Sequence, residues 1–272
     1  MFQELMELIW YIIIILILLG FLVGIVSSIA GIGGGVFFVP IMTLILLYPI
    51  NKAIDTSTFI ILISSGVAFA VYLKDKKIAL KPTLIFTAFS ILGSLTCTLL
   101  TFYFKFDNSL LKILFATTLI FAGLNMIRKA LTFRKRTKNQ DIEEEDDFSL
   151  MDHDYRSNLF KSIPLFFLAG FVANLLGIGG GVINTPALNI VLGYPIHNST
   201  AISTGIIFFT AIFNTIIKSI YGEIDYIVGI FIAMGAVLGA AFGARISNRI
   251  TKVHLQFLVA FILIILAIRM YF

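Results

Sequence analysis

The feature that most limits what this chain can fold into is a set of long apolar runs with almost no charge. Residues 10–30 form one such run, and residues 255–268 form another. About 20 apolar residues in a helix span the hydrocarbon core of a bilayer, and these runs reach or approach that length. Because 59% of the 272 residues are hydrophobic, a single soluble core could not bury them. We therefore expect an all-α polytopic membrane protein.

A charged stretch divides the chain into two apolar halves. We expect a first transmembrane repeat over 1–128, a charged cytoplasmic linker over 129–160 and a second transmembrane repeat over 161–272. The linker is first basic and then acidic, which makes it too polar for lipid. Five apolar segments can be assigned in each half, at about 9–30, 36–47, 56–73, 82–104 and 109–127, and at about 163–176, 182–193, 199–219, 226–247 and 253–271.

The two halves share a glycine-rich phrase, GIGGGVFFVPIMTLILLYPI at 31–50 and GIGGGVINTPALNIVLGYPI at 177–196. Eleven of the 20 positions are identical at a shift of 146 residues, which indicates an internal duplication. The apolar segment after each glycine run has about 12 residues, or roughly 18 Å of helix, which is too short to cross a bilayer. Short segments broken by Gly and Pro in two halves are typical of secondary transporters. We therefore expect one broken or re-entrant helix in each half and about eight spans in total.

The sequence leaves two topologies open. If each half crosses the membrane four times, the halves are parallel and both termini are cytoplasmic. If the first two segments of each half form a re-entrant hairpin, each half crosses three times and the halves are inverted. Lys and Arg are enriched on the cytoplasmic side of membrane proteins, but their distribution barely separates these two arrangements here.

The glycine runs are the first candidate site. Glycine allows tight turns and a close approach of backbone N–H groups to a ligand, and the helices expected from Val36 and Val182 would point their positive N-terminal ends at the same place. Two such turns would form an anion site that needs no side-chain cation. The alternative is that the glycines only allow close helix packing. The candidate substrate-binding glycines are Gly31, Gly33, Gly34, Gly35, Gly177, Gly179, Gly180 and Gly181.

Hydroxyl side chains follow each glycine phrase and could donate hydrogen bonds to an anionic oxygen. They could equally cap helices or join membrane helices to one another. The candidates are Thr56, Ser57, Ser64 and Ser65 in the first half, and Ser203 and Thr204 in the second.

The charged residues within the apolar segments indicate the sign of the charge on the substrate. We assign the Lys and Arg residues to loops and interfaces, so that Asp55 is the only charge expected in a candidate core segment. Transporters of cations and metals usually need intramembrane carboxylates, and the scarcity of carboxylates here favours an anion. Asp55 and His197 are the candidates for a coupling role, although either could simply cap a helix.

Several classes of ligand are not expected. The net charge of +5 is explained by basic cytoplasmic loops, so no nucleic-acid partner is expected. The sequence Asp152-His153-Asp154 lies in the polar linker and is more typical of a solvated loop than of a metal site. Cys97 lies in an apolar run and is expected to be a small buried side chain. We expect no metal site and no cofactor.

The glycine run, the following Pro, the Tyr-Pro turn, the stretch AIDTSTFIILISSGVAFAVYLK (53–74) and SIYGEIDY (219–226) resemble the TauE/SafE sulfite exporter-like membrane proteins. The resemblance covers nearly the whole chain except 128–160. It implies an all-α permease built by internal duplication, which exports, or in some members takes up, sulfite, sulfonates or related small organic anions under an ion gradient. Carried over by position, it implies functional roles for the glycines and for Thr56, Ser57, Ser64 and Ser65.

The expected function is therefore secondary transport of a small anion, as an exporter in the plasma membrane. The expected partners are the small anionic substrate and the lipid bilayer, and assembly into a homo-oligomer is left open. A passive anion channel is the alternative. An intramembrane enzyme is a third reading, but no nucleophile–base pair is recognisable in the apolar segments, so the chain is not expected to be an enzyme.

Overall fold

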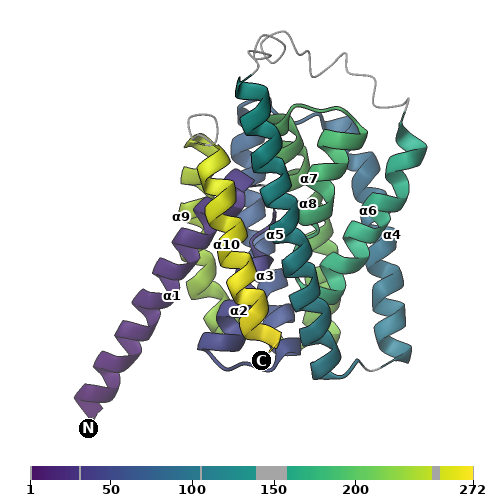
Figure 1. The fold of residues 1–272 in the computed structure, drawn as a ribbon. Helices are drawn as coiled ribbons and strands as arrows, with labels where there is room; N and C mark the ends of the chain where they lie inside the picture. The colour runs from purple at the N-terminus through teal and green to yellow at the C-terminus, as the bar shows by residue number, and fades with distance from the viewer. Residues whose placement is uncertain (1, 31, 105, 139–157, 247–251, 272) are drawn as a thin grey trace.

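The protein is a bundle of long helices (Figure 1) in a computed structural model that describes residues 2–30, 32–104, 106–138, 158–246 and 252–271. The described residues contain no strand. Their elements, in chain order, are α1 (Phe2–Ala30), α2 (Gly35–Pro40), η1 (Ile41–Ile45), α3 (Ile50–Lys74), α4 (Leu80–Tyr103), α5 (Asn108–Lys138), α6 (Leu159–Leu176), α7 (Gly181–Pro186), η2 (Ala187–Val191), α8 (Ile196–Tyr221), α9 (Tyr226–Ile246) and α10 (Lys252–Tyr271).

Within the described ranges, seven helices are long and apolar enough to cross a membrane. Three further apolar helices are shorter, at Gly35–Ile45, Gly181–Val191 and Val259–Tyr271. A helix satisfies its own backbone hydrogen bonds, so an apolar helix can lie in lipid without unpaired N–H or C=O groups. The fold is that of a multi-pass helical membrane protein.

The two short segments have the same construction. Each begins after a glycine with a left-handed backbone, since Gly34 has φ 73° and Gly180 has φ 76°. Pro40 and Pro186 end the α-helical turns, and a π-helical turn follows each of them. Proline removes a backbone donor and disturbs the regular hydrogen-bond pattern of a helix. Each segment is therefore a short, broken helix.

Helix α1 packs mainly against α9, and α6 packs mainly against α4. Glycine makes both contacts close. Gly235 and Gly239 of α9 lie against the backbone of α1, while Gly93 of α4 lies against the backbone of Phe167 in α6. A side chain at these glycines would collide with the neighbouring carbonyl oxygen, which is the small-residue packing typical of membrane helices.

The ends of the helices define two ends of the bundle (Figure 1). The start of α1 and the end of α10 lie at the lower end in this view, and the end of α5 and the start of α6 lie at the upper end. Two hydrogen bonds place the broken first segment, which comprises α2 and η1, between these two ends of the bundle. Near the upper end, the Tyr72 hydroxyl donates to the Ser28 carbonyl at the close of α1. At the lower end, the Tyr48 hydroxyl donates to Asp225, just before α9. The chain thus ascends along α1 and returns through α2 and η1 before α3 begins.

The expected linker is only partly described. Helix α5 continues to Lys138, so residues 129–138 of the expected 129–160 linker are helical. Residues 139–157, with Asp152, His153 and Asp154, lie outside the described residues, as does Gly31.

Candidate functional site

The two glycine turns contact each other at the centre of the bundle. A Cβ on Gly179 would lie 3.4 Å from the Cα of Gly33, and a Cβ on Gly33 would lie 3.3 Å from the Cα of Gly179. Both glycines have a left-handed backbone, with φ 88° at Gly33 and φ 80° at Gly179. Both also face Ile207, near the middle of α8. The glycine phrases of the two halves therefore meet between the ends of the bundle, and we call this contact the glycine crossing.

The other candidate glycines that the structure describes lie in the same two turns as the crossing. Gly35 packs directly on the backbone of Gly177, which has φ 65°. Gly34 and Gly180 precede the two short helices that start at Gly35 and Gly181. The N–H groups of Phe37 and Phe38 both donate to the carbonyl of Gly34, and those of Ile183 and Asn184 both donate to the carbonyl of Gly180. These first-turn donors are satisfied within their own turn.

The candidate hydroxyls are buried and bonded to the protein itself. Ser57 donates to the carbonyl of Gly177 at 2.8 Å, which ties α3 to the second glycine turn. Ser64 and Ser65 donate to Ile61 in their own helix. Thr204 likewise donates to the carbonyl of Thr200, Thr56 accepts a hydrogen bond from the backbone N–H of Asp225, and Ser203 is fully buried. These contacts support the alternative interpretation, in which the hydroxyls join the membrane helices to one another and hold the second glycine turn in place.

A small cavity of about 10 Å³ lies beside Gly179. Its polar walls come from Thr58 of α3 and from Thr210 and Asn214 of α8. The Oδ1 atom of Asn214 is buried and has no hydrogen-bond partner among the described residues. The cavity is about as large as one water molecule, so in this conformation it is too small for an oxyanion.

A much larger cleft of about 620 Å³ is lined in part by residues from the end of α4 and the start of α5. These helix ends lie at the lower end of the bundle in Figure 1. Elements from both halves form the cleft, and its lining mixes polar and apolar side chains. The residues that line it are Asn51, Ile54, Asp55, Cys97, Thr98, Thr101, Phe102, Phe106, Leu111, Asn174, Leu175, Ile217, Lys218, Tyr221, Gly222 and Glu223.

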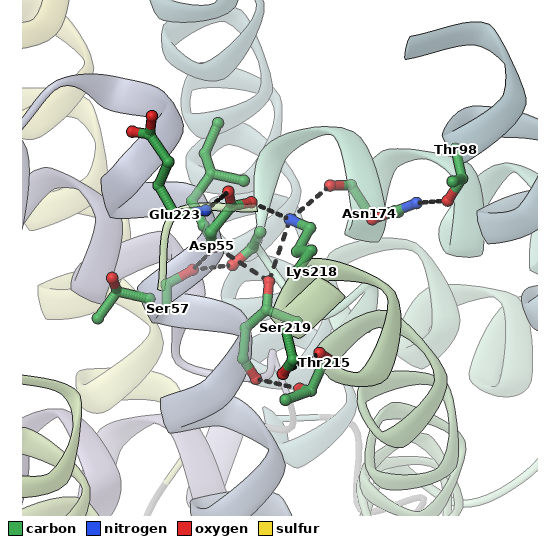
Figure 2. Close-up of polar contacts among 12 residues, drawn as sticks. Asp55, Ser57, Thr98, Asn174, Thr215, Lys218, Ser219 and Glu223 are labelled. Carbon is green, nitrogen blue, oxygen red and sulfur yellow. Dashed lines mark hydrogen bonds and ion pairs between the residues drawn. The ribbon is translucent and has the colours of Figure 1, made fainter. Parts of the chain in front are cut away.

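Two opposite charges lie in the wall of this cleft, and Figure 2 shows their polar contacts. The Lys218 ammonium of α8 lies 3.1 Å from Asp55 Oδ1 of α3. Their side chains are 10% and 16% exposed, so the pair is buried but still borders the cleft. Lys218 also donates to the Asn174 carbonyl at 3.0 Å and to Thr58 Oγ1 at 3.3 Å. All three ammonium donors therefore have acceptors.

A second layer of hydrogen bonds holds this arrangement. The Asn174 side-chain amide donates to the Ser94 carbonyl and to Thr98 Oγ1, at 2.9 and 2.7 Å, which fixes α6 against α4. The backbone N–H of Glu223 donates to Asp55 Oδ2 at 3.0 Å. Gly222 permits this contact, because a Cβ there would lie only 2.7 Å from Asp55 Oδ2.

The cleft reaches almost to the glycine crossing. Ile54 lines the cleft, and its carbonyl oxygen would lie 2.7 Å from a Cβ on Gly177. On α8, Thr210, Asn214 and Lys218 follow one another at intervals of four residues, which places them on one helix face. All three are buried. A polar face of α8 therefore runs from the crossing to the cleft.

Lys218 corrects the expectation that Asp55 is the only charge in the apolar segments. Its position near the end of α8 is compatible with a loop or interface charge, but packing against α3 and α6 buries it. A signal for the pair was present, because ionisable residues in membrane helices usually pair with one another. His197 lies at the other end of α8, about 30 Å from Lys218 at 1.5 Å per residue, so it is not brought together with Asp55.

A cluster of polar contacts closes the lower end beside the cleft. Asp225 accepts hydrogen bonds from the Tyr48 hydroxyl at 2.8 Å and from the Val228 N–H at 3.2 Å, and it pairs with Lys52 at 2.9 Å. Burial raises the pKa of Asp225, but the hydrogen bonds from Lys52, Tyr48 and Val228 outweigh burial and hold that pKa below its ordinary value. Burial, followed by the hydrogen bond to Asp225, raises the pKa of Tyr48 to about 12. We call Tyr48, Lys52 and Asp225 the latch.

Metal ligands do not gather in the described part of the chain, where no group of three His, Cys, Asp or Glu side chains could hold an ion. Cys97 is buried in the wall of the cleft, as expected for a small side chain in an apolar run.

Comparison with known proteins gives a consistent result. The model of the family described as "Sulfite exporter TauE/SafE" matches residues 16–270. A "Probable membrane transporter protein" of Methanocaldococcus jannaschii is 32% identical over 203 residues, which cover 73% of this chain and 69% of the relative. A "Probable membrane transporter protein" of Bacillus subtilis is 26% identical over 235 residues, which cover 82% of this chain and 84% of the relative. No solved structure matches the chain significantly.

Proposed function

Since the chain belongs to the TauE/SafE sulfite exporter family, we propose that this membrane transporter exports small anions, such as sulfite, sulfonates or related organic anions, by secondary transport coupled to an ion gradient. The names of its relatives describe transporters and support a role other than that of an enzyme. The proposed location is the plasma membrane.

The observation that carries this proposal is the buried ammonium of Lys218 in the wall of a polar cleft. An ionisable side chain within a membrane helix is costly and marks a substrate or ion pathway more often than a structural contact. A cation at this position favours an anionic substrate, and the cleft volume of about 620 Å³ is ample for a sulfonate. The anion site of this proposal therefore combines a side-chain cation with the nearby glycine crossing.

The separation of the cavities is the closed arrangement that alternating access requires in each of its end states. In the part of the chain that is described, the cleft and the small cavity beside Gly179 are separate spaces, with Thr58 and Lys218 bonded between them. A passive channel would need these spaces to join. Movement of the two halves around the glycine crossing is the proposed route between the two sides of the membrane.

Inverted repeats are the proposed arrangement of the halves. Exchanging the halves turns the α1–α9 contact into the α6–α4 contact and leaves the α3–α8 and α5–α10 contacts unchanged. The opposite ends at which α1 and α6 begin (Figure 1) support inversion over a parallel arrangement. With the end of α5 and the start of α6 on the cytoplasmic side, the cleft at the opposite end of the bundle faces the outside.

The function can be tested with purified protein in proteoliposomes. We expect uptake of labelled sulfite or a sulfonate above protein-free vesicles, with saturation and a response to an imposed pH gradient. The panel comprises sulfite, sulfate, thiosulfate, sulfoacetate and simple carboxylates. If no anion of the panel crosses faster than in protein-free vesicles, the proposed function is wrong; a flux that neither saturates nor responds to a gradient would indicate a channel.

A further inference from the structure

Each member of the Asp55–Lys218 pair has hydrogen-bond partners besides the other member. Lys218 holds three acceptors, and only one of them is Asp55. If an anion replaces the Asp55 carboxylate, the Asn174 carbonyl and Thr58 Oγ1 still hold the ammonium in place. Asp55 in turn keeps the hydrogen bond from the Glu223 N–H. Both side chains border the cleft, so an anion can reach them from there.

Charge balance then links the anion to a proton. Without an anion the pair is neutral. An anion on Lys218 beside an ionised Asp55 would leave one net negative charge among side chains that are mostly buried in the bundle, which is costly. A proton on the released Asp55 carboxylate removes this charge, so the unloaded and loaded sites are both neutral.

On this basis, which rests on the proposed function, we propose that Asp55 is the internal counter-ion of Lys218 and exchanges with the transported monoanion. The ion pair between Lys218 and Asp55 breaks, an ion pair between Lys218 and the anion forms, and Asp55 takes one proton from the water of the cleft. Release of the anion reverses each step. One monoanion and one proton therefore cross together, and net transport carries no charge. Export then follows the combined outward gradient of the anion and the proton, and an acidic outside favours uptake.

Few other groups can supply this proton balance. The titratable side chains that line the cleft around Asp55 are Lys218 and Tyr221 from α8, Cys97 from α4 and Glu223 from the turn before α9. Helices α5 and α6 contribute no titratable side chain to the lining. Asp225 is already bonded to Tyr48 and Lys52 in the latch. The Glu223 carboxylate points away from Lys218 (Figure 2), so Asp55 is the carboxylate that the ammonium holds.

The Asp55→Asn variant distinguishes the step in which the protein crosses with its anion from the step in which it returns empty. The loaded variant has Lys218 paired with the anion beside a neutral amide, which is the charge state of the loaded wild type. The unloaded variant has an unpaired buried ammonium and must carry it through the return step. We therefore expect exchange of anion for anion at a rate within threefold of wild type and independent of pH. Net uptake should fall at least tenfold and become sensitive to membrane voltage.

The test uses the full chain in proteoliposomes with labelled sulfite and labelled methanesulfonate, whose charge does not change with pH. Net anion uptake by the wild type should rise when the outside is made more acidic. It should not change with a membrane voltage set by potassium and valinomycin. Asp75→Asn is the matched control, since it removes an exposed carboxylate that lies 3.4 Å from Lys77. The Asp75→Asn variant should leave both anion exchange and net anion uptake unchanged.

Three results would overturn this inference while the proposed function stands. They are a voltage-driven net flux in wild type, wild-type net flux in Asp55→Asn, and loss of exchange in an Asp55→Asn protein that is folded and monodisperse. If Asp55→Asn does not fold, the voltage measurement on wild type decides alone. A wild-type protein that moves neither anion in either mode counts against the proposed function itself.

Discussion

Gly33 and Gly179 lie so close, although they are 146 residues apart in the sequence, that a Cβ on either one would be within 3.4 Å of the Cα of the other. Both adopt a left-handed backbone, which residues with a side chain rarely adopt. Their contact joins the two halves of the chain at mid-height on α8, where both face Ile207. A side chain at either position must therefore push against the other half.

Gly33→Leu and Gly179→Leu should abolish anion flux while the protein still inserts in the membrane. A left-handed backbone costs a non-glycine residue about 1–2 kcal/mol, and a Cβ at Gly179 would already lie 3.3–3.5 Å from Ile207 and Gly33. The milder Gly179→Ala variant should lower the melting temperature by several degrees and reduce flux at least tenfold.

Gly123→Ala serves as the control for these variants. Gly123 lies in α5, and its nearest neighbour would be a side-chain atom of Ile264 at 3.1 Å. The Gly123→Ala variant should retain most of the anion flux. Unchanged sulfite or sulfonate flux in Gly33→Leu and Gly179→Leu would exclude the glycine crossing from the transport pathway.

The latch predicts a dependence of stability on pH. The folded pKa of Asp225 is lower than its ordinary value, which is about 3.9 in an unfolded chain. Its stabilising effect is therefore fully present above about pH 4 and is lost as the pH falls through the lower, folded pKa. Asp225→Asn should lower the melting temperature in detergent at neutral pH, with a loss of about 1–2 kcal/mol.

Tyr48→Phe removes one hydrogen bond to Asp225 and should lose about 1 kcal/mol at neutral pH. With Asp225→Asn already present, Tyr48→Phe should have a smaller effect than in wild type, because the charged acceptor is gone. Additive losses in the double variant would show that Tyr48 acts independently of Asp225.

If the two halves are inverted repeats, the lower end of the bundle faces the outside of the cell and the upper end faces the cytoplasm. In a Cys97→Ala background, a cysteine at Tyr271, which is 59% exposed, should react with an impermeant maleimide from outside intact cells. Tyr103→Cys should also react from outside, and Phe160→Cys should react only after permeabilisation. A parallel arrangement instead protects Tyr271→Cys in intact cells, so this single residue distinguishes the two topologies.

The sequence alone predicts much of the architecture because its signals are local. Long apolar runs specify membrane helices, and the Gly-rich and Pro-containing phrases specify two short broken segments. The left-handed backbone at Gly33, Gly34, Gly179 and Gly180 follows from a residue type that tolerates it. The close approach of the two turns is a long-range feature, and the repeat predicts only that both turns point at the same place.

The cleft was missed because its key residue lies near the end of an apolar segment. From the sequence, Lys218 has the appearance of an interface charge, since α8 ends three residues later. Only the packing of α3 and α6 around it shows that Asp55, Thr58 and Asn174 take up its three donors. Conversely, the candidate hydroxyls Ser57, Ser64 and Ser65 donate to backbone carbonyls, which their residue type alone did not reveal.

The most direct test of anion transport through the cleft is the flux of labelled sulfite and methanesulfonate in the Asp55→Asn/Lys218→Met double variant. Lys218→Met alone would strand a buried carboxylate, which can cost about 3–5 kcal/mol, and the second change removes that charge. Lys112→Met, an exposed lysine of α5, is the control. We predict that the double variant folds but loses both exchange and net uptake of either anion, while Lys112→Met transports normally. Wild-type flux in the double variant would contradict the role of Lys218 and with it this account of the site.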